Sequence, residues 1–134
     1  MAQIFQGDAV AVNNSTAIVT TAETVAVTGN PLSLPYTNAK IRIRGWVQVT
    51  PGTSTTGITI RIRRGTTITD TLVGPATNLT AGVLAAATQQ FSAAFTDSLQ
   101  GLVQAQYSLT VQQAGAAANG SIVAAMIESE VLSG

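Results

Sequence analysis

The most regular alternation of hydrophobic and polar positions runs from Ala39 to Val49. Isoleucine, glycine and valine occupy every second position, and lysine, arginine, tryptophan and glutamine fill the positions between them. Successive side chains of a β-strand point to opposite faces of its sheet, so this alternation predicts a strand with one apolar and one polar face. Residues 58–63 repeat the pattern with isoleucine on one face and threonine or arginine on the other. Both strands are therefore expected to carry arginine on the face away from the core.

Runs of β-branched residues between Gly, Pro and Asn clusters predict the other strands. These strands are expected over residues 3–12, 16–28, 66–73, 88–96, 101–113 and 121–132. The segment Ala85 to Phe95 also suits helical turns, because Phe91 and Phe95 are four positions apart. The run from Ile122 to Ile127 is apolar on both faces, which indicates a strand at the centre of a sheet or at a subunit interface.

About eight strands predict an all-β fold, an antiparallel β-sandwich of the jelly-roll type. A single domain is expected over residues 1–134, because 46% of the residues are hydrophobic and no linker interrupts the chain. In a jelly roll the first strand pairs with the last, the second with the seventh, the third with the sixth and the fourth with the fifth. The two arginine-bearing strands then lie in different sheets, whereas a hairpin across residues 51–57 would place Arg44 beside Arg63 and Trp46 beside Arg61. The sequence leaves both pairings open, and an immunoglobulin-like sandwich is the alternative fold.

Composition excludes several kinds of chemistry. The chain contains no His and no Cys, which excludes thiol catalysis, His-based proton relays, disulfides and zinc fingers. Six basic and six acidic residues give a net charge of zero, so general electrostatic attraction to nucleic acid or to an anionic membrane is not expected. The start MAQIFQGDAV has no basic region and the chain has no run of about 18 apolar residues, so we expect neither a signal peptide nor a membrane span.

The acidic residues offer only weak candidates for catalysis. Glu128 and Glu130 are two positions apart and share a strand face, which suits a weak calcium site or a glycosidase carboxylate pair. A polysaccharide-cleaving enzyme would need these two residues, or Asp70 and Asp97, to converge at about 5 to 10 Å in a cleft. Serine catalysis without His would need Lys40 as the base. We expect no enzymatic activity, no cofactor and no bound metal.

The basic residues are concentrated, since all six lie between Lys40 and Arg64. The candidate interface consists of Arg42, Arg44, Trp46, Arg61 and Arg63. Outward arginines beside an exposed indole can stack on sugars or bases. They can also lie along a sheet, pair with acidic residues and cover the indole at a contact with another protein. We favour the protein contact, because six charges are few for a nucleic-acid binder and the rest of the surface is uncharged.

Three segments are similar to a known kind of sequence: AKIRIRGWVQVTPGTSTTGITIRIRRGT, GLVQAQYSLTVQQAG and NGSIVAAMIESEVL. They resemble small jelly-roll proteins of tumour-necrosis-factor-like topology that tailed bacteriophages and related viruses carry as virion surface proteins. The similarity covers roughly residues 15–132 and lies in the pattern of strands and turns. The resemblance implies a capsid decoration or head-fibre protein, usually a homotrimer, that sits on a shell formed by a separate major capsid protein. It implies no catalytic residues.

The sequence therefore predicts a non-enzymatic virion structural protein, made in the host cytoplasm, that decorates or stabilises a capsid as a symmetric homo-oligomer. Tyr107 and Met126 are the candidate trimer contacts. No contact with the genome is expected, because MAQIFQGDAVAVNN contains no basic residue. One alternative is a glycan-binding or receptor-binding module with Trp46 exposed in a groove, whereas the virion hypothesis expects Trp46 to be covered by arginine stems or by a partner. The second alternative is a small jelly-roll capsid subunit.

Overall fold

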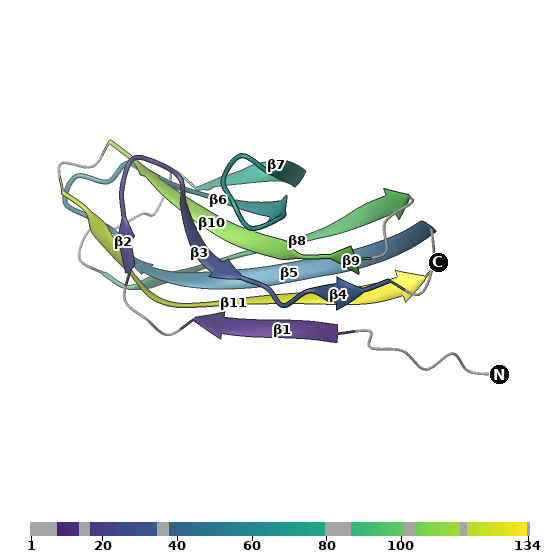
Figure 1. The fold of residues 1–134 in the computed structure, drawn as a ribbon. Coiled ribbons are helices and arrows are strands. Elements are labelled where there is room, and N and C mark those ends of the chain that lie inside the picture. The colour runs from purple at the N-terminus through teal and green to yellow at the C-terminus, as the bar shows by residue number, and fades with distance from the viewer. Residues whose placement is uncertain are drawn as a thin grey trace.

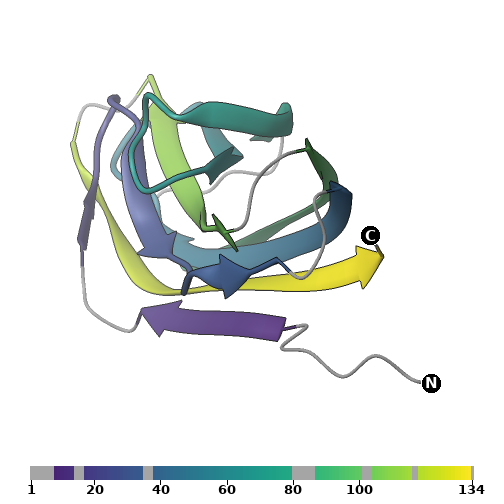
Figure 2. The ribbon, with the colours of Figure 1, turned by 45° about the vertical axis from the view of Figure 1, so that its right-hand side comes forward.

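Eleven strands in two facing layers make up the described part of the chain, which comprises residues 8–13, 17–34, 38–79, 87–100, 104–115 and 118–133 of a computed structural model (Figure 1). One layer is a five-stranded sheet of β1 (Asp8–Asn13), β11 (Gly120–Ser133), β5 (Asn38–Thr50) and β8 (Gln89–Gln100), with β2 (Ala17–Val19) beside β11. The other layer is a four-stranded sheet of β3 (Thr24–Thr28), β10 (Tyr107–Ala114), β6 (Gly57–Arg64) and β7 (Thr71–Leu79). A short pair, β4 (Leu32–Ser33) and β9 (Gln104–Ala105), prolongs the second layer beyond β3 and β10 (Figure 2).

The strand pairings are those of a jelly roll. β1 pairs with β11, β3 with β10, β5 with β8 and β6 with β7, all antiparallel. The predicted fold class is therefore confirmed, and the immunoglobulin-like alternative is excluded because its sheets pair different strands. The hairpin alternative is also wrong, because β5 and β6 belong to different sheets. Arg44 lies opposite Glu128 and Ala94, and Arg63 lies opposite Ser108 and Leu72.

The predicted strand over residues 16–28 is two strands in the structure. β2 pairs with β11 of the five-stranded sheet, and β3 pairs with β10 of the four-stranded sheet. Between them the chain crosses from one layer to the other through a turn in which the Thr20 hydroxyl accepts a hydrogen bond from the Ala22 N–H at 3.0 Å. Two strands that are consecutive in sequence can therefore belong to different sheets when a short polar turn separates them.

Other boundaries also differ from the predictions. Residues 65–70 form a turn, so the strand expected over 66–73 begins at Thr71 instead. In this turn the Asp70 carboxylate accepts hydrogen bonds from the backbone N–H groups of Thr66 and Thr67, both at 2.9 Å. Residues 89–100 are a strand, so the alternative of helical turns is wrong in the described part of that segment. Residues 3–7 and 101–103 of the predicted strands lie outside the described residues.

The core lies between the two main sheets and follows the predicted alternation. On β5 the side chains of Ile41, Ile43, Val47 and Val49 are buried, while the intervening side chains lie on the outer face. Facing them, β6 buries Ile58, Ile60 and Ile62, and β10 buries every residue from Tyr107 to Val111. β11 lies between β1 and β5, so of the two places expected for its doubly apolar segment the structure bears out the centre of a sheet, and a subunit interface stays a prediction.

Candidate functional site

The structure separates the five candidate interface residues into two groups. Arg42, Arg44 and Trp46 lie on β5 and point away from the core on the outer face of the five-stranded sheet. Arg61 and Arg63 lie on β6 and belong to the outer face of the four-stranded sheet. On both strands the candidate residues occupy the positions that point away from the core. Because β5 and β6 lie in different sheets, the two groups occupy opposite outer faces of the sandwich.

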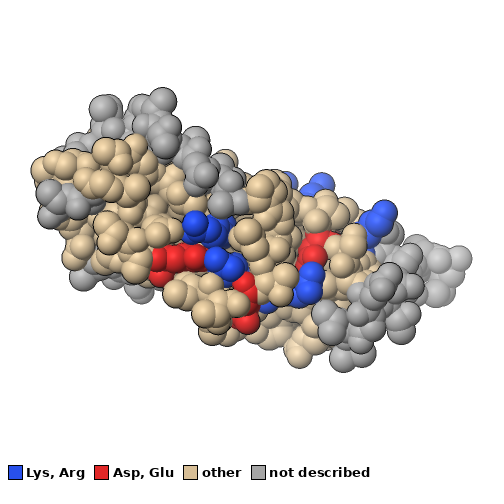
Figure 3. All heavy atoms as spheres, turned by 90° about the horizontal axis from the view of Figure 1, so that it is seen from above, with Lys and Arg blue, Asp and Glu red and all other residues tan. Residues whose placement is uncertain are grey.

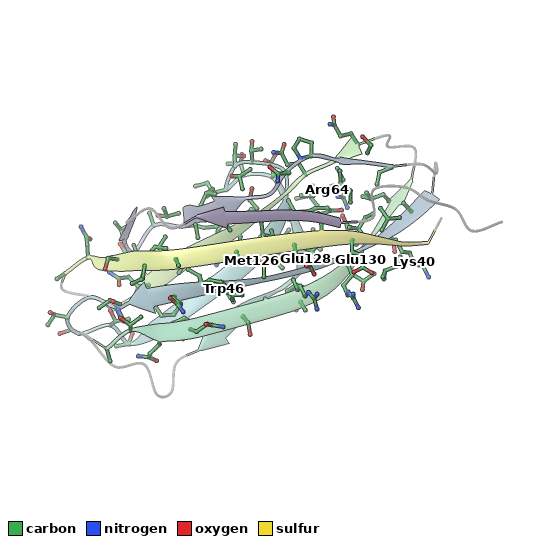
Figure 4. The ribbon with its side chains drawn as sticks, turned by 90° about the horizontal axis from the view of Figure 1, so that it is seen from below. Lys40, Trp46, Arg64, Met126, Glu128 and Glu130 are labelled. Atoms are coloured by element: carbon green, nitrogen blue, oxygen red, sulfur yellow. The ribbon has the colours of Figure 1, made fainter. Side chains whose placement is uncertain are left out.

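Two ion pairs connect β5 to β11 on the outer face of the five-stranded sheet. The register places Arg44 opposite Glu128 and Arg42 opposite Glu130, the two acidic residues of β11 that Figure 4 labels. Arg42 Nη2 lies 2.8 Å from Glu130 Oε2, and Arg44 Nε donates to Glu128 Oε1. Both arginine side chains remain largely exposed, so each pair contributes only about 0–1 kcal/mol to folding. The pairs nevertheless neutralise this part of the face.

Next to these ion pairs the face is hollowed around the single tryptophan. Trp46 lies between Met126 on β11 and Ser92 on β8, and it is half-buried. β8 carries small residues here, so the larger side chains of its neighbours surround a depression of about 340 Å³. This Trp46 depression is lined by Arg44, Gly45, Trp46, Ser92, Ala93, Ala94 and Met126. Arg44, Trp46 and Met126 were candidates from the sequence. The part that β8 plays in this depression was not foreseen, because small residues such as Ser92 and Ala94 carry no chemical signal.

The outer face of the four-stranded sheet is organised around Glu23, which the sequence analysis did not identify. Arg63 binds the Glu23 carboxylate through two hydrogen bonds, Nε to Oε2 at 2.7 Å and Nη2 to Oε1 at 2.8 Å. The Thr110 hydroxyl donates to Glu23 Oε2 at 2.6 Å, and Arg61 Nη1 lies 3.5 Å from Glu23 Oε1. Basic and acidic side chains accordingly adjoin on the surface seen from above (Figure 3). Arg61 and Arg63 thus have partners within their own chain.

These contacts set the ionisation of Glu23. Burial alone raises the pKa of the Glu23 carboxyl, but the hydrogen bonds from Arg63 and Thr110 and the charges of both arginines lower it more. The net pKa of Glu23 lies below its ordinary value of 4.5. The ionised form is therefore favoured in the folded protein.

This shift predicts acid-sensitive stability. A carboxyl with a lowered pKa in the folded state stabilises the fold fully above its unfolded pKa, and this stabilisation is lost as the pH falls through the folded pKa. Urea unfolding at a series of pH values should give a free energy of unfolding that falls below pH 4.5. Glu23→Gln should lower that free energy by about 1.5 kcal/mol at neutral pH and weaken its fall in acid. If Glu23→Gln showed the same acid dependence as the wild type, Glu23 would not be the source of the acid sensitivity. Glu130→Gln, at the exposed ion pair with Arg42, is the control, and it should lower the free energy of unfolding by less.

A third cluster lies between the sheets, where Arg64 points inward at the end of β6. Arg64 binds Asp97 of β8 through two hydrogen bonds of 2.7 Å, and the Tyr107 hydroxyl donates to Asp97 Oδ2 at 2.9 Å. Asp97 is 7% exposed and Tyr107 is 1% exposed. Burial, followed by the charge of Asp97, raises the pKa of the Tyr107 hydroxyl far above its ordinary value of 10.0. The cluster joins the two sheets at one end of the sandwich.

This placement corrects the prediction for Tyr107. A side chain that is 1% exposed in one chain offers no surface to a second copy, so Tyr107 is a core residue rather than a trimer contact. Its polar hydroxyl is buried because Asp97 accepts its hydrogen bond. Met126 is half-buried on the outer face of the five-stranded sheet, and its role as a trimer contact stays a prediction.

The four carboxylates considered for catalysis are each bound to other groups. Glu128, Glu130 and Asp97 pair with arginines, and Asp70 closes its turn. None of them lines the Trp46 depression or the second depression, of about 260 Å³, between residues 50–53 and 118–121. Within the described ranges no three His, Cys, Asp or Glu side chains gather as a metal site would require. The same residues include no helix long and apolar enough to cross a membrane.

Comparison with solved structures finds similarity of fold at a low level. No family model matches the chain, and no curated protein matches it. The chain is similar to a chain in the "Structure of infectious bursal disease virus Gx strain", with a TM-score of 0.40 and 12% sequence identity over 92% of this chain and 33% of that chain. The protein thus spans about a third of the length of that viral chain. What it does is therefore inferred from its own residues.

Proposed function

We propose that the protein is a non-enzymatic virion structural protein that decorates or stabilises a capsid as a symmetric homo-oligomer, with a homotrimer as the expected state. The jelly-roll pairing agrees with the topology that the sequence resemblance implies. The proposed partners are further copies of the chain and a separate major capsid protein. Association by burial of surface requires no catalytic group.

The observation that carries the proposal is the difference between the two outer faces. On the four-stranded sheet Leu72 of β7 is 40% exposed, but the outward side chains that contact Glu23 are polar and hydrogen-bonded within the chain, and Arg61 Nη1 also donates to Gln112 Oε1 at 2.9 Å. On the five-stranded sheet, Trp46 and Met126 surround an apolar depression. β11 also exposes Val123 and Leu132, at 42% and 45%. Removing apolar side chains from water favours association, so the five-stranded sheet is the proposed self-association face.

The charges of this face are compatible with burial in an interface. An ion pair whose partners already contact each other within one chain can enter an interface without leaving either charge unpaired. Arg42 and Arg44 meet this condition through Glu130 and Glu128. The aliphatic stems of the arginines would then contribute contact area beside Trp46.

Light scattering of the purified protein tests the oligomer. We expect a mass of about three times 13.7 kDa for the wild type. Met126→Glu should reduce the mass to 13.7 kDa, because a carboxylate in the buried contact would lose its water without a partner. Thr28→Glu, at an exposed position on the edge strand β3 of the other sheet, is the control that should keep the mass. A monomeric wild type would contradict the proposed homo-oligomer. An unchanged mass for Met126→Glu would exclude the outer face of the five-stranded sheet as the self-association face.

Immunogold labelling of virus particles tests the virion role. Particles produced from the genome that encodes the chain should bind an antibody against the protein on their outer surface. Label that is lost when the particles are purified from the lysate would contradict the proposal. Closed particles formed by the purified chain alone would instead support the small capsid subunit.

A glycan-binding module is the second candidate, because Trp46 does line a depression together with Arg44 and Ser92. The chain contains a single tryptophan, so its fluorescence reports on Trp46 alone. If Trp46 lies in a subunit contact, dilution of the oligomer should shift its emission to longer wavelengths, and soluble oligosaccharides should leave the emission unchanged. A saturable change with an oligosaccharide, without dependence on protein concentration, would favour the glycan module instead.

A further inference from the structure

β8 is an edge strand with unusual properties for an exposed edge. It lies at the end of the five-stranded sheet and is twelve residues long. All twelve residues pair with β5 in one uninterrupted register, Gln89 with Val49 through Gln100 with Asn38. About half of the backbone N–H and C=O groups of such a strand point away from β5, the strand that pairs with it among the described residues. β8 therefore presents a long, uninterrupted row of backbone donors and acceptors.

The other edges of the described sheets carry features that oppose pairing. β7 has Gly74 at a φ of 70° next to Pro75, which has no N–H group, and its register with β6 is interrupted. β1 and β3 are only six and five residues long, and β3 has a shifted register with β10. Natural edge strands avoid edge-to-edge pairing through such bulges, prolines, charges and short lengths. Of these features β8 has only one charge, the inward-pointing Asp97, which Arg64 neutralises, and it has no proline, no lysine and no bulge.

The side chains of β8 are compatible with a second copy of the same strand. Its exposed outer positions hold small or uncharged residues, namely Gln90, Ser92, Ala94, Thr96 and Ser98. Its single charge, Asp97, faces the core and is bound by Arg64. Two copies of β8 can therefore approach without like charges meeting, and the net charge of zero adds no long-range repulsion.

The inner face of β8 indicates where the centre of such a pair lies. Phe91, Asp97 and Leu99 are buried, whereas Ala93 and Phe95 are only partly buried. In an antiparallel pair whose twofold axis passes through Ala94, Phe95 of each copy lies opposite Ala93 of the other. Each partly buried ring, which also lies next to Gly74 of β7, then meets a partly buried methyl group of the other copy, a favourable cross-strand arrangement.

We propose that β8 pairs antiparallel with β8 of a second copy about a twofold axis at Ala94, joining two five-stranded sheets edge to edge. This contact goes beyond the proposed function, because it uses the edge of the sheet rather than its outer face and links oligomers laterally. Hydrogen bonds exchanged with water contribute little net free energy each. The contact therefore forms at high local protein concentration, as between copies held on one surface.

Cysteine cross-linking tests this register in a chain that has no cysteine of its own. Ala94→Cys should give a disulfide-linked dimer of twice 13.7 kDa on a non-reducing gel, because residues opposite each other at the axis lie within disulfide range. A mixture of Ser92→Cys and Thr96→Cys proteins should cross-link, whereas each protein alone should not. A mixture that cross-links no more than either protein alone would overturn the register. Efficient linking of Ala94→Cys without linking in the mixture would do the same.

Two further measurements separate this contact from the proposed oligomer. Cross-linking should persist when Met126→Glu is added to each cysteine variant, because the backbone groups of the β8 edge make the strand pairing and Met126 of β11 takes no part in it. If Met126→Glu abolished the cross-linking, the proposal that β8 pairs independently of the self-association face would be overturned. In the unmodified wild type, hydrogen exchange of β8 amides should slow as the protein concentration rises, while exchange on β7 stays constant. Concentration-independent exchange on β8 would overturn the proposal without relying on any variant.

Discussion

Replacing Asp97 with Asn is expected to lower the free energy of unfolding by about 3 kcal/mol, because it leaves Arg64 without its carboxylate between the two sheets. Asp97 accepts both hydrogen bonds from Arg64 and a third from the Tyr107 hydroxyl. The Asn amide has nearly the same volume but only one acceptor oxygen, and its NH₂ group faces donors. The effect is an electrostatic one without a change in packing. Urea unfolding at neutral pH measures it.

Two variants calibrate this result. Tyr107→Phe removes one hydrogen bond from the same carboxylate and should cost about 1 kcal/mol. Ser98→Asn introduces the same amide at the next position on the exposed face and should change the free energy by less than about 0.5 kcal/mol. An Asp97→Asn loss no larger than that of Ser98→Asn would show that the Arg64 pair does not hold the sheets together.

Replacing Gln113 with Leu is expected to destabilise the opposite end of the sandwich by about 3 kcal/mol. Gln113 is 1% exposed although its side chain is polar. Its Oε1 atom accepts hydrogen bonds from the Gly52 N–H at 3.2 Å and the Thr55 hydroxyl at 3.3 Å, and its Nε2 atom donates to the Ala118 carbonyl at 2.9 Å. Leucine has a similar volume but removes the partner of the Gly52 N–H and of the Ala118 carbonyl, while the Thr55 hydroxyl keeps its hydrogen bond to the Gly52 carbonyl at 2.6 Å. An unpaired buried polar group costs about 1 to 3 kcal/mol.

The neighbouring residue provides the matched control. Gln112→Leu makes the same substitution on the outer face, where Gln112 donates to the Thr21 carbonyl at 2.7 Å and accepts from Arg61 Nη1 at 2.9 Å. Water can replace both hydrogen bonds there, so the expected loss is about 1 kcal/mol. Equal losses for the two variants, measured by thermal or urea unfolding, would contradict the proposed role of Gln113 as the polar link between residues 52–55 and residue 118.

Local patterning carried much of the information about the fold. The alternation from Ala39 to Val49 identified which side chains of β5 are buried, and the doubly apolar run of β11 identified a central strand. Both are short-range properties, because side chains of a strand alternate whatever the strand pairs with. The jelly-roll rule then matched each strand with its partner, although the sequence left the hairpin alternative open.

The candidate site was identified only in part. Trp46 and Met126 do lie side by side on one face. The alternation of β5 and β6 did not choose between the jelly-roll pairing, which puts their arginines in different sheets as observed, and the hairpin, which would have put them side by side. Side-chain alternation specifies a face of one strand, whereas the sheet to which the strand belongs depends on pairings far along the chain. Glu23 was overlooked for the same reason, since its turn becomes distinctive only when β3 lies beside β10 and β6.

The sequence by itself determined the all-β class, the principal strands, the neutral charge and the absence of His and Cys chemistry. Only the tertiary structure decided which charges meet, that Tyr107 is buried beside Asp97 and Arg64, and that β8 is a long open edge. The physical reason is the range of the interactions involved. Alternation and composition act within a strand, whereas ion pairs, burial and free edges arise from the register and layering of strands that are distant in the sequence.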